Sequence, residues 1–510
     1  MTEPTERPVR LHSARDPHKE AHRYISSLPE LRGSRVVVVT EPGESYLATA
    51  LRDLHPEARI VAVRYGDTRF LDSDQLWDAV WRPGFGVSLA TFLFSLLTEE
   101  ILPQTAFVAW KPSDGYWPAE SSAAWAEIAA VMRTQRSVLQ TRVHFGPRWL
   151  SNSVRNAILS GSVVADEPIR VPCVITASGP TLARLFPFEN RDSFFVIALS
   201  SSLTAVLARG ITPDLCITTD GGYWANRHIA NIPPNVPVAF PLEAALPSRV
   251  LGSNRLLVFD YGSPLERALF SLSGVRGTPA EQSGTVAGTA ALYALSRSDR
   301  EVFAAGLDLA PGSARNHCMP HAFDGIVESS SSRVFPISQN LYERASSAAA
   351  LEIYARWFSS RTGDFAKRFF RINPAQSSLG GIREADRSLV ERAARDSAAP
   401  NGKPAFDNGV QKAPRGLVSA WLTESTEAFK DRGRTRDLAE YIAHEALAGD
   451  ANAVAPDDRA VLADLLKLVS FRDYLALLRE GPETWVAPEG ISRDLEALSG
   501  KARTLEAGRA

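Results

Sequence analysis

The stretch that most constrains the fold is residues 171–182, where a short apolar run breaks into Ser178-Gly179-Pro180-Thr181 before a helical pattern begins. Such a run is typical of a strand covered on both faces, as in a parallel sheet. Gly179 lets the backbone come close to a ligand, and Pro180 presets the first turn of a helix. Because the first N–H groups of a helix favour an anion, the stretch predicts a nucleotide loop. A plain strand-to-helix turn is the alternative.

Strands alternate with helices after this turn. Further strands are expected at residues 194–199, 215–218, 238–240, 255–259 and 302–305. Alternation at this spacing indicates a Rossmann-like, mostly parallel sheet, whose ligands collect where the strands end. We therefore expect four groups to share one rim of this sheet: the Ser178–Thr181 turn, Ser200–Ser202 with Ser201 as a candidate binding residue, Asp220 and Asp308.

An earlier β-α-β pattern begins the chain. Asp16 and Pro17 predict the start of a helix, strands are expected at Val36–Thr40 and 59–64, and the turn after the first strand contains one glycine, Gly43. A dinucleotide-binding turn carries three glycines at fixed spacing. The pattern favours a scaffold α/β domain over a working cofactor site.

The length of the chain indicates more than one domain. At 510 residues it exceeds an ordinary single core. Residues 397–404 have the Pro, Gly and Asn content of a linker, and residues 457–478 carry an apolar stripe at helical spacing. We predict an N-terminal α/β domain over 1–160, a central α/β domain over 161–385 and a helical C-terminal region over 386–510.

The composition argues against several classes of protein. Lys and Arg number 56 against 58 Asp and Glu, a balance that gives no sign of a nucleic-acid partner. The cysteines Cys173, Cys216 and Cys318 form no C-x-x-C pair, which fits a reducing compartment and argues against structural zinc. The most apolar stretch, 87–97, is shorter than a membrane span, and the first residues lack the order of a signal peptide. We expect a cytoplasmic protein without membrane insertion.

Four elements together resemble the motility-associated factor (Maf) glycosyltransferases, which modify flagellin with nonulosonic acids. These elements are the His, Asp-Pro and Glu-Ala of residues 11–21, the turn at 177–182, the run 201–220 with its Gly-Ile-Thr-Pro-Asp, and Ser283-Gly-Thr followed by Gly-Leu-Asp-Leu-Ala at 306–310. Asn373 with Gly380-Gly381-Ile382 adds a fifth point of agreement. The resemblance covers roughly residues 11–385.

The central domain is also similar to bacterial sialyltransferases that use CMP-sugars. Gly179, Pro180 and Thr181 match the Gly-Pro-Ser of their nucleotide loop, with Ser178 in the place of an Asn. The resemblance implies that Ser283-Gly284-Thr285 holds the cytidine phosphate and that Asp308 lies near the ribose and sugar. It implies transfer of a pseudaminic or legionaminic type sugar from its CMP donor to Ser or Thr of flagellin, in support of flagellum assembly and motility.

Such a transfer needs a cradle for CMP, stabilisation of an oxocarbenium-like centre and of the leaving phosphate, and a base for the acceptor hydroxyl. Asp220 and Asp308 are candidates for binding sugar hydroxyls, a metal ion or transition-state charge. Whether Mg²⁺ takes part stays open. His317 and His321 are the candidate bases because imidazole titrates near neutral pH, and Asp324 is a further candidate.

Two other functions fit parts of the sequence. The archaeal MptE-like pterin diphosphokinases share the central motifs, and there the same loop would bind ATP and Mg²⁺. The large flanking regions and the Leu-Asp-Leu-Ala continuation favour the transferase. A non-catalytic flagellin-binding chaperone with a vestigial nucleotide fold is the third hypothesis. Binding of CMP, of ATP or of neither distinguishes the three.

Overall fold

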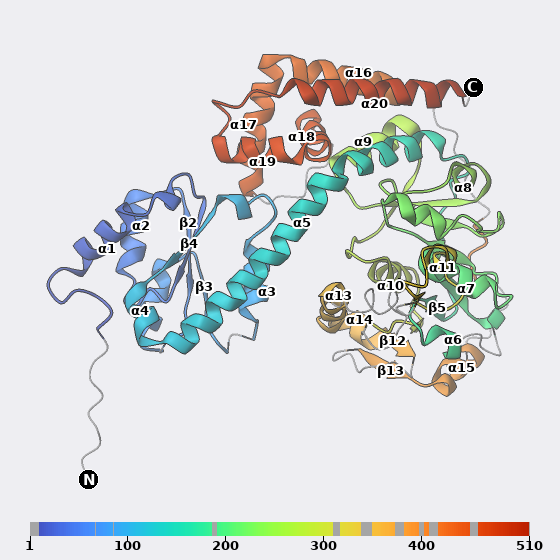
Figure 1. The fold of residues 1–510 in the computed structure, drawn as a ribbon, viewed down its shortest axis with the longest axis horizontal. Coiled ribbons are helices and arrows are strands. Elements are labelled where there is room, and N and C mark those ends of the chain that lie inside the picture. The colour runs from blue at the N-terminus through green and yellow to red at the C-terminus, as the bar shows by residue number, and fades with distance from the viewer. Residues whose placement is uncertain are drawn as a thin grey trace, which may run out of the picture. The chain divides into compact units, whose positions relative to one another are not determined.

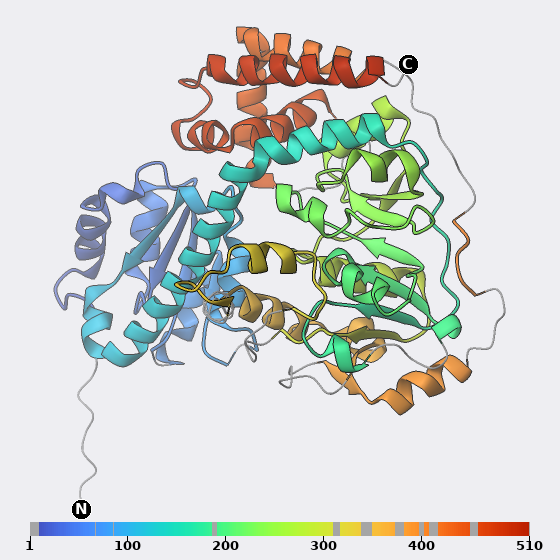
Figure 2. The ribbon, with the colours of Figure 1, turned by 45° about the vertical axis from the view of Figure 1, so that its right-hand side comes forward.

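The computed structural model divides the chain into two compact units (Figure 1 and Figure 2). Unit 1 comprises Met1–Gly146, Phe429–Ala453 and Ser470–Pro488, and unit 2 comprises Pro147–Ala428, Val454–Val469 and Glu489–Ala510. The three domains predicted from the sequence do not follow these boundaries and stay a prediction. The structure describes residues 10–66, 68–84, 86–185, 191–309, 317–337, 349–372, 382–396, 402–406, 417–448 and 457–508.

A four-stranded parallel sheet forms the centre of unit 1. Its strands lie in the order β3 (Ala79–Trp81), β2 (Arg59–Val63), β1 (Val36–Thr40) and β4 (Thr105–Ala109). Its helices are α1 (Pro17–Ser26), α2 (Tyr46–Leu54), α3 (Leu89–Leu96), α4 (Lys111–Tyr116) and the first part of α5 (Pro118–Leu159). Val37 and Val39 pack with α1 and α2, whereas Val36 and Val38 pack with α3 and α5. The strand is apolar throughout because both of its faces are covered.

Unit 2 is built on a nine-stranded parallel sheet in the order β10-β9-β8-β7-β6-β5-β11-β12-β13. The α/β fold class and the mostly parallel, Rossmann-like central sheet predicted from the sequence are therefore confirmed. The strands are β5 (Cys173–Thr176), β6 (Phe195–Leu199), β7 (Leu215–Ile217), β8 (Val238–Pro241), β9 (Leu256–Asp260), β10 (Gly277–Pro279), β11 (Val302–Ala305), β12 (Phe369–Ile372) and β13 (Arg383–Ala385).

The strand order of this sheet reverses at β5. The chain lays β6 to β10 successively on one side of β5 and then returns to place β11 on its other side. In open α/β sheets, ligands bind outside the carboxyl ends of the strands at such a reversal. The loops that follow β5 and β11 are thus where a site is expected.

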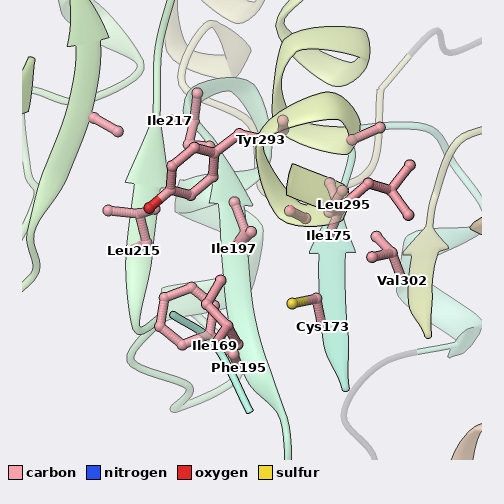
Figure 3. Packing of buried hydrophobic residues seen from close by; sticks show 14 of the residues in the cluster. Ile169, Cys173, Ile175, Phe195, Ile197, Leu215, Ile217, Tyr293, Leu295 and Val302 are labelled. Atoms are coloured by element: carbon pink, nitrogen blue, oxygen red, sulfur yellow. The ribbon is translucent and has the colours of Figure 1, made fainter. Parts of the chain in front are cut away.

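Two apolar layers cover the nine-stranded sheet. Figure 3 shows one of them, in which alternate residues of β5, β6 and β7 pack toward Tyr293 and Leu295. The intervening residues, among them Val174 and Val196, face the opposite layer. The helices of this unit between β5 and the tail are α6 (Leu182–Leu185), α7 (Leu203–Leu207), α8 (Ser248–Ser253), α9 (Pro264–Ser273), α10 (Val286–Arg297), α11 (Asp324–Ser329), α13 (Ala349–Ser359), α14 (Gly363–Arg368) and α15 (Arg387–Arg395).

The C-terminal tail is helical, as the sequence predicts, but its helices are shared between the two units. In unit 1, Arg35 Nη1 donates to Ala443 O of α17 at 2.9 Å, and in unit 2, Leu265 N donates to Asp464 Oδ2 of α18 at 3.3 Å. Phe406, just after the predicted linker, is buried and contacts Phe195. The tail helices are α16 (Leu417–Lys430), α17 (Arg432–Ala448), α18 (Asp458–Val469), α19 (Phe471–Glu480) and α20 (Glu489–Gly508).

No described helix is both long and apolar enough to cross a membrane. The motif residues Asn373, Gly380 and Gly381 lie outside the described residues.

The turn after β1 in unit 1 is filled by the chain's own charged groups. The Glu41 carboxylate is fully buried, lies 3.1 Å from Nη1 of the buried Arg64, and accepts the N–H groups of Tyr65 and Gly66. Arg64 also donates to Asp74 and to the carbonyl of Gly43. The Arg64 guanidinium and the Glu41 carboxylate thus neutralise each other's charge inside the unit.

We expect Arg64→Met to lower the free energy of unfolding of unit 1 by about 3–5 kcal/mol, because it leaves the Glu41 carboxylate buried without its cation. Arg52→Met is the matched control, since the Arg52–Asp78 pair has side chains 40% and 35% exposed. There we expect a loss of about 0–1 kcal/mol. Urea denaturation measures both, and equal losses would contradict the assignment of Glu41 and Arg64 as a structural pair.

Candidate functional site

Hydrogen bonds join the turn after β5 directly to the loop after β11. Gly179 N donates to Gly306 O at 2.8 Å. Thr181 donates its N–H to Asp308 Oδ2 at 2.9 Å and its hydroxyl to Asp308 Oδ1. A Cβ at Gly179 would lie 2.4 Å from Gly306 O and 2.5 Å from Asp308 Oδ2. Glycine is needed here because another loop of the protein approaches the backbone.

This geometry corrects the expectation that free N–H groups of the turn hold a phosphate. The N–H groups of Ala177, Gly179, Thr181 and Leu182 all have acceptors within the chain, and Pro180 has no N–H. The Asp308 carboxylate, which is buried, takes the position that an anion would take at the helix start. These four N–H groups are therefore not free to bind a ligand at this turn.

Three histidines lie beside the turn. Ser178 Oγ is 3.0 Å from His317 Nδ1, and the His317 ring stacks on His321 with ring centres 4.3 Å apart. His321 in turn contacts His228, whose ring centre is 5.2 Å away. The structure thus brings together Ser178, His317 and His321, which were identified from the sequence, and adds His228, which was not. We call His228, His317 and His321 the imidazole cluster.

The surroundings keep the imidazole cluster largely uncharged at neutral pH. Burial, together with the neighbouring His317 and His228, lowers the pKa of His321 to about 3. Burial also lowers the pKa of His228 and His317 below the usual histidine value, and this is opposed by Asp220 for His228 and by Asp324 for His317. His317 is exposed as a residue, but the stacked His321 ring removes water from one of its faces.

The hydrogen bonds of His321 define its tautomer. Phe323 N–H donates to His321 Nδ1 at 3.4 Å, so that nitrogen carries no hydrogen and the neutral ring holds its proton on Nε2. The backbone N–H of His321 donates to Asp324 Oδ2 at 2.7 Å, which fixes the loop. His321 is therefore suited to donate a hydrogen bond. Its low pKa makes it a poor proton acceptor.

The carboxylates at the rim have different environments. Asp220, in the loop after β7, is exposed and accepts the Gly222 N–H through Oδ1 at 2.7 Å. Asp308 is engaged by both donors of Thr181, so it positions the turn. Asp324 anchors the loop of His321. Among the described residues, no group of three or more His, Cys, Asp or Glu side chains could hold a metal ion.

Ser283 and Thr285 form the cap of helix α10. Thr285 Oγ1 accepts the Gly288 N–H at 2.9 Å, and Ser283 Oγ donates to Thr285 O at 2.9 Å. Gly284 has a positive φ of 73°, the region that favours glycine. Ser201 lies in the 3₁₀ turn Ser200–Ser202 that follows β6. These residues follow strands of the same parallel sheet, and their role in binding a ligand stays a prediction.

Three known proteins or families are similar to parts of this chain. Residues 149–313 match the family model described as 6-hydroxymethylpterin diphosphokinase MptE-like. An uncharacterized protein of Treponema pallidum (strain Nichols) is 33% identical over 298 residues, 58% of this chain and 66% of that protein. The structure of MAf glycosyltransferase from Magnetospirillum magneticum AMB-1 aligns with 97% of this chain and 86% of that chain, at 14% identity and a TM-score of 0.44.

The fold and the site thus define a Rossmann-like α/β protein with an imidazole cluster at the strand reversal, and its residues 149–313 match the MptE-like model. The family model covers less than half of the chain.

We expect Gly179→Ala to lower the free energy of unfolding of unit 2 by about 1–3 kcal/mol, because the new methyl group overlaps Gly306 and Asp308. Gly252→Ala is the control, since a Cβ there meets no atom within 4 Å. Chemical denaturation of both variants is the measurement. An unchanged midpoint for Gly179→Ala would mean that the two loops separate easily.

Proposed function

We propose that this chain is a glycosyltransferase that moves a nonulosonic acid of the pseudaminic or legionaminic type from a CMP donor to Ser or Thr hydroxyls of flagellin. The observation that carries the proposal is the position of His317 at the strand reversal, with its Nδ1 3.0 Å from Ser178 Oγ, and burial lowers the pKa of this imidazole. The order of the sequence motifs supports the same activity. The proposal includes a cytoplasmic location and involves neither a nucleic acid nor insertion into a membrane.

His317 is the proposed base. When its Nδ1–H is donated to Ser178 Oγ, the lone pair of Nε2 is free to take the proton of an acceptor hydroxyl. The negative charge of Asp324 favours the imidazolium that results. Ser178 then orients the ring, which gives a reason for a short hydroxyl side chain at the position where the sialyltransferases have Asn.

The remaining residues of the site have binding and positioning roles in this proposal. Asp308 holds Thr181 and so fixes the turn that carries Ser178. The exposed Asp220 has one oxygen bonded to Gly222 N, and it is available to a sugar hydroxyl. The cap of α10, with Ser283 and Thr285, is the proposed position of the leaving phosphate, because helix N-termini favour anions. The proposal requires no cofactor, and participation of Mg²⁺ stays open.

A pterin diphosphokinase is the second candidate, because residues 149–313 match the MptE-like model. That reaction uses ATP with Mg²⁺ in place of CMP-sugar. A flagellin-binding chaperone is the non-catalytic candidate. Calorimetry of the purified chain with CMP, with ATP and Mg²⁺, and with flagellin separates the three. Binding of ATP without CMP would favour the diphosphokinase, and binding of flagellin alone would favour the chaperone.

We expect His317→Ala to lower turnover on flagellin by roughly 10²–10⁴-fold while CMP-sugar binding stays near its original value, because a base acts in the transition state. His22→Ala, at an exposed position of α1, is the control and keeps normal turnover. Normal turnover of His317→Ala would transfer the role to a carboxylate such as Asp324.

The pH dependence of the wild-type rate provides a second check on His317. Its pKa lies below the usual histidine value, so the base is already deprotonated at neutral pH, and the rate falls only as the pH drops below about 6.5. This acid limb is absent from the residual rate of His317→Ala. A limb retained in the variant would contradict His317 as the titrating base.

A further inference from the structure

Two nitrogens of the imidazole cluster are buried and unpartnered. His321 Nε2 and His228 Nδ1 have no hydrogen-bond partner within the part of the chain that the structure describes. Their rings are in contact, with centres 5.2 Å apart and planes at 65°, and His321 is only 8% exposed. Buried polar groups are almost always paired, because an unpaired one loses its bonds to water. Each of the two nitrogens is therefore available to an oxygen atom of another molecule.

The chemistry of that oxygen follows from the protonation of the rings. His321 Nε2 carries a hydrogen, because Nδ1 accepts the Phe323 N–H. It needs an acceptor. Nδ1 of a neutral His228 can accept a hydrogen bond when its proton is on the other nitrogen. A hydroxyl group accepts one hydrogen bond and donates another, so it satisfies both rings without a change of charge.

We propose that His321 Nε2 and His228 Nδ1 together bind one hydroxyl group of a carbohydrate substrate, His321 donating to it and His228 accepting from it. The inference deepens the proposed function, which supplies the class of substrate. His228 and His321 are then substrate-binding residues, and His317 is left to move the proton. In this proposal, two residues of the imidazole cluster bind the substrate and the third acts as the base.

Aromatic side chains beside the pair support a carbohydrate as the ligand. The Phe323 ring centre is 4.9 Å from that of His228 and 5.5 Å from that of His321. Trp224, which is 57% exposed, continues the row at 6.5 Å from Phe323. Ligand sites combine an apolar, aromatic wall with a few directed polar groups. Here the wall leads from an exposed indole to the two nitrogens.

The charges that surround the pair favour a hydroxyl over an anionic oxygen. Asp220 acts on His228, and Asp324 acts on the adjacent His317. The nearby cations already have partners, since Arg209 donates to the carbonyls of Ala205 and Met319 and Arg227 lies over the Trp224 ring. A carboxylate or phosphate between the two imidazoles would face both Asp side chains, whereas a neutral hydroxyl has no such cost.

The test uses amide side chains that reproduce one ring nitrogen at a time. Asn places its amide near Nδ1 of the imidazole it replaces, and Gln places its amide near Nε2. We expect His321→Gln to retain CMP-N-acetylneuraminic acid binding and His321→Asn to weaken it about 10-fold, the effect of one hydrogen bond. At His228 the order reverses, so that His228→Asn retains binding and His228→Gln weakens it about 10-fold. Calorimetry measures all four, with CMP itself as the control ligand, whose affinity stays unchanged.

The outcomes separate this inference from the proposed function. If the wild-type protein binds CMP-N-acetylneuraminic acid but Asn and Gln act alike at either position, the inference is overturned and the proposed function stands. If the wild-type protein binds neither CMP nor the CMP-sugar, the proposed function fails. The inference is then decided by ¹⁵N NMR of the imidazoles at pH 7, with a panel of monosaccharides as probes.

That NMR measurement has its own two requirements. The free protein must show His321 as the Nε2–H tautomer, and at least one monosaccharide must shift the His321 Nε2 and His228 Nδ1 signals together. The opposite tautomer would overturn the inference. So would an absence of shifts throughout the panel, which would mean that the two nitrogens hold only water.

Discussion

The site depends on the hydrogen bonds between Thr181 and Asp308. They join the turn after β5 to the loop after β11, at the point where the strand order reverses. A carboxylate held by the amide and hydroxyl at a helix start makes the interactions that a bound anion would make. This pair of hydrogen bonds therefore holds the Asp308 carboxylate where other doubly wound proteins bind a phosphate. It also fixes the backbone of Ser178, whose carbonyl accepts the Cys318 N–H at 2.7 Å and whose hydroxyl faces His317.

In the smaller sheet, too, a buried carboxylate accepts backbone N–H groups. After β1, the Glu41 carboxylate accepts the N–H groups of Tyr65 and Gly66 and is neutralised by Arg64. In both sheets an internal carboxylate satisfies backbone amides at a turn that follows a central strand. The N–H groups of Thr181, Tyr65 and Gly66 are thus already hydrogen-bonded within the chain. In the proposed function, the side chains of the imidazole cluster take part in recognising a ligand at the rim of unit 2.

The sequence predicted what depends on local pattern. Apolar runs identified strands such as Val36–Thr40. Three residues chosen separately from the sequence, Ser178, His317 and His321, lie together in the structure. The sequence could not predict that Asp308 would satisfy Thr181 from 127 residues away, because nothing local distinguishes a carboxylate that binds a ligand from one that caps a helix. His228 was missed for a related reason. It follows a short 3₁₀ helix without a motif, and its contact with His321 exists only when the loops after β7 and β11 are folded.

The electrostatic coupling among the three imidazoles determines which of them takes up a proton. A positive charge on His317 lowers the pKa of both His228 and His321. When His317 takes up a proton, protonation of its two neighbours therefore becomes less favourable, and they keep their neutral hydrogen-bonding forms. The proton is thus favoured on His317, the most exposed of the three residues, where the charge of Asp324 opposes the lowering of the pKa by burial. A pair of neutral nitrogens beside a base that changes charge can hold a substrate hydroxyl in one geometry before and after the proton moves.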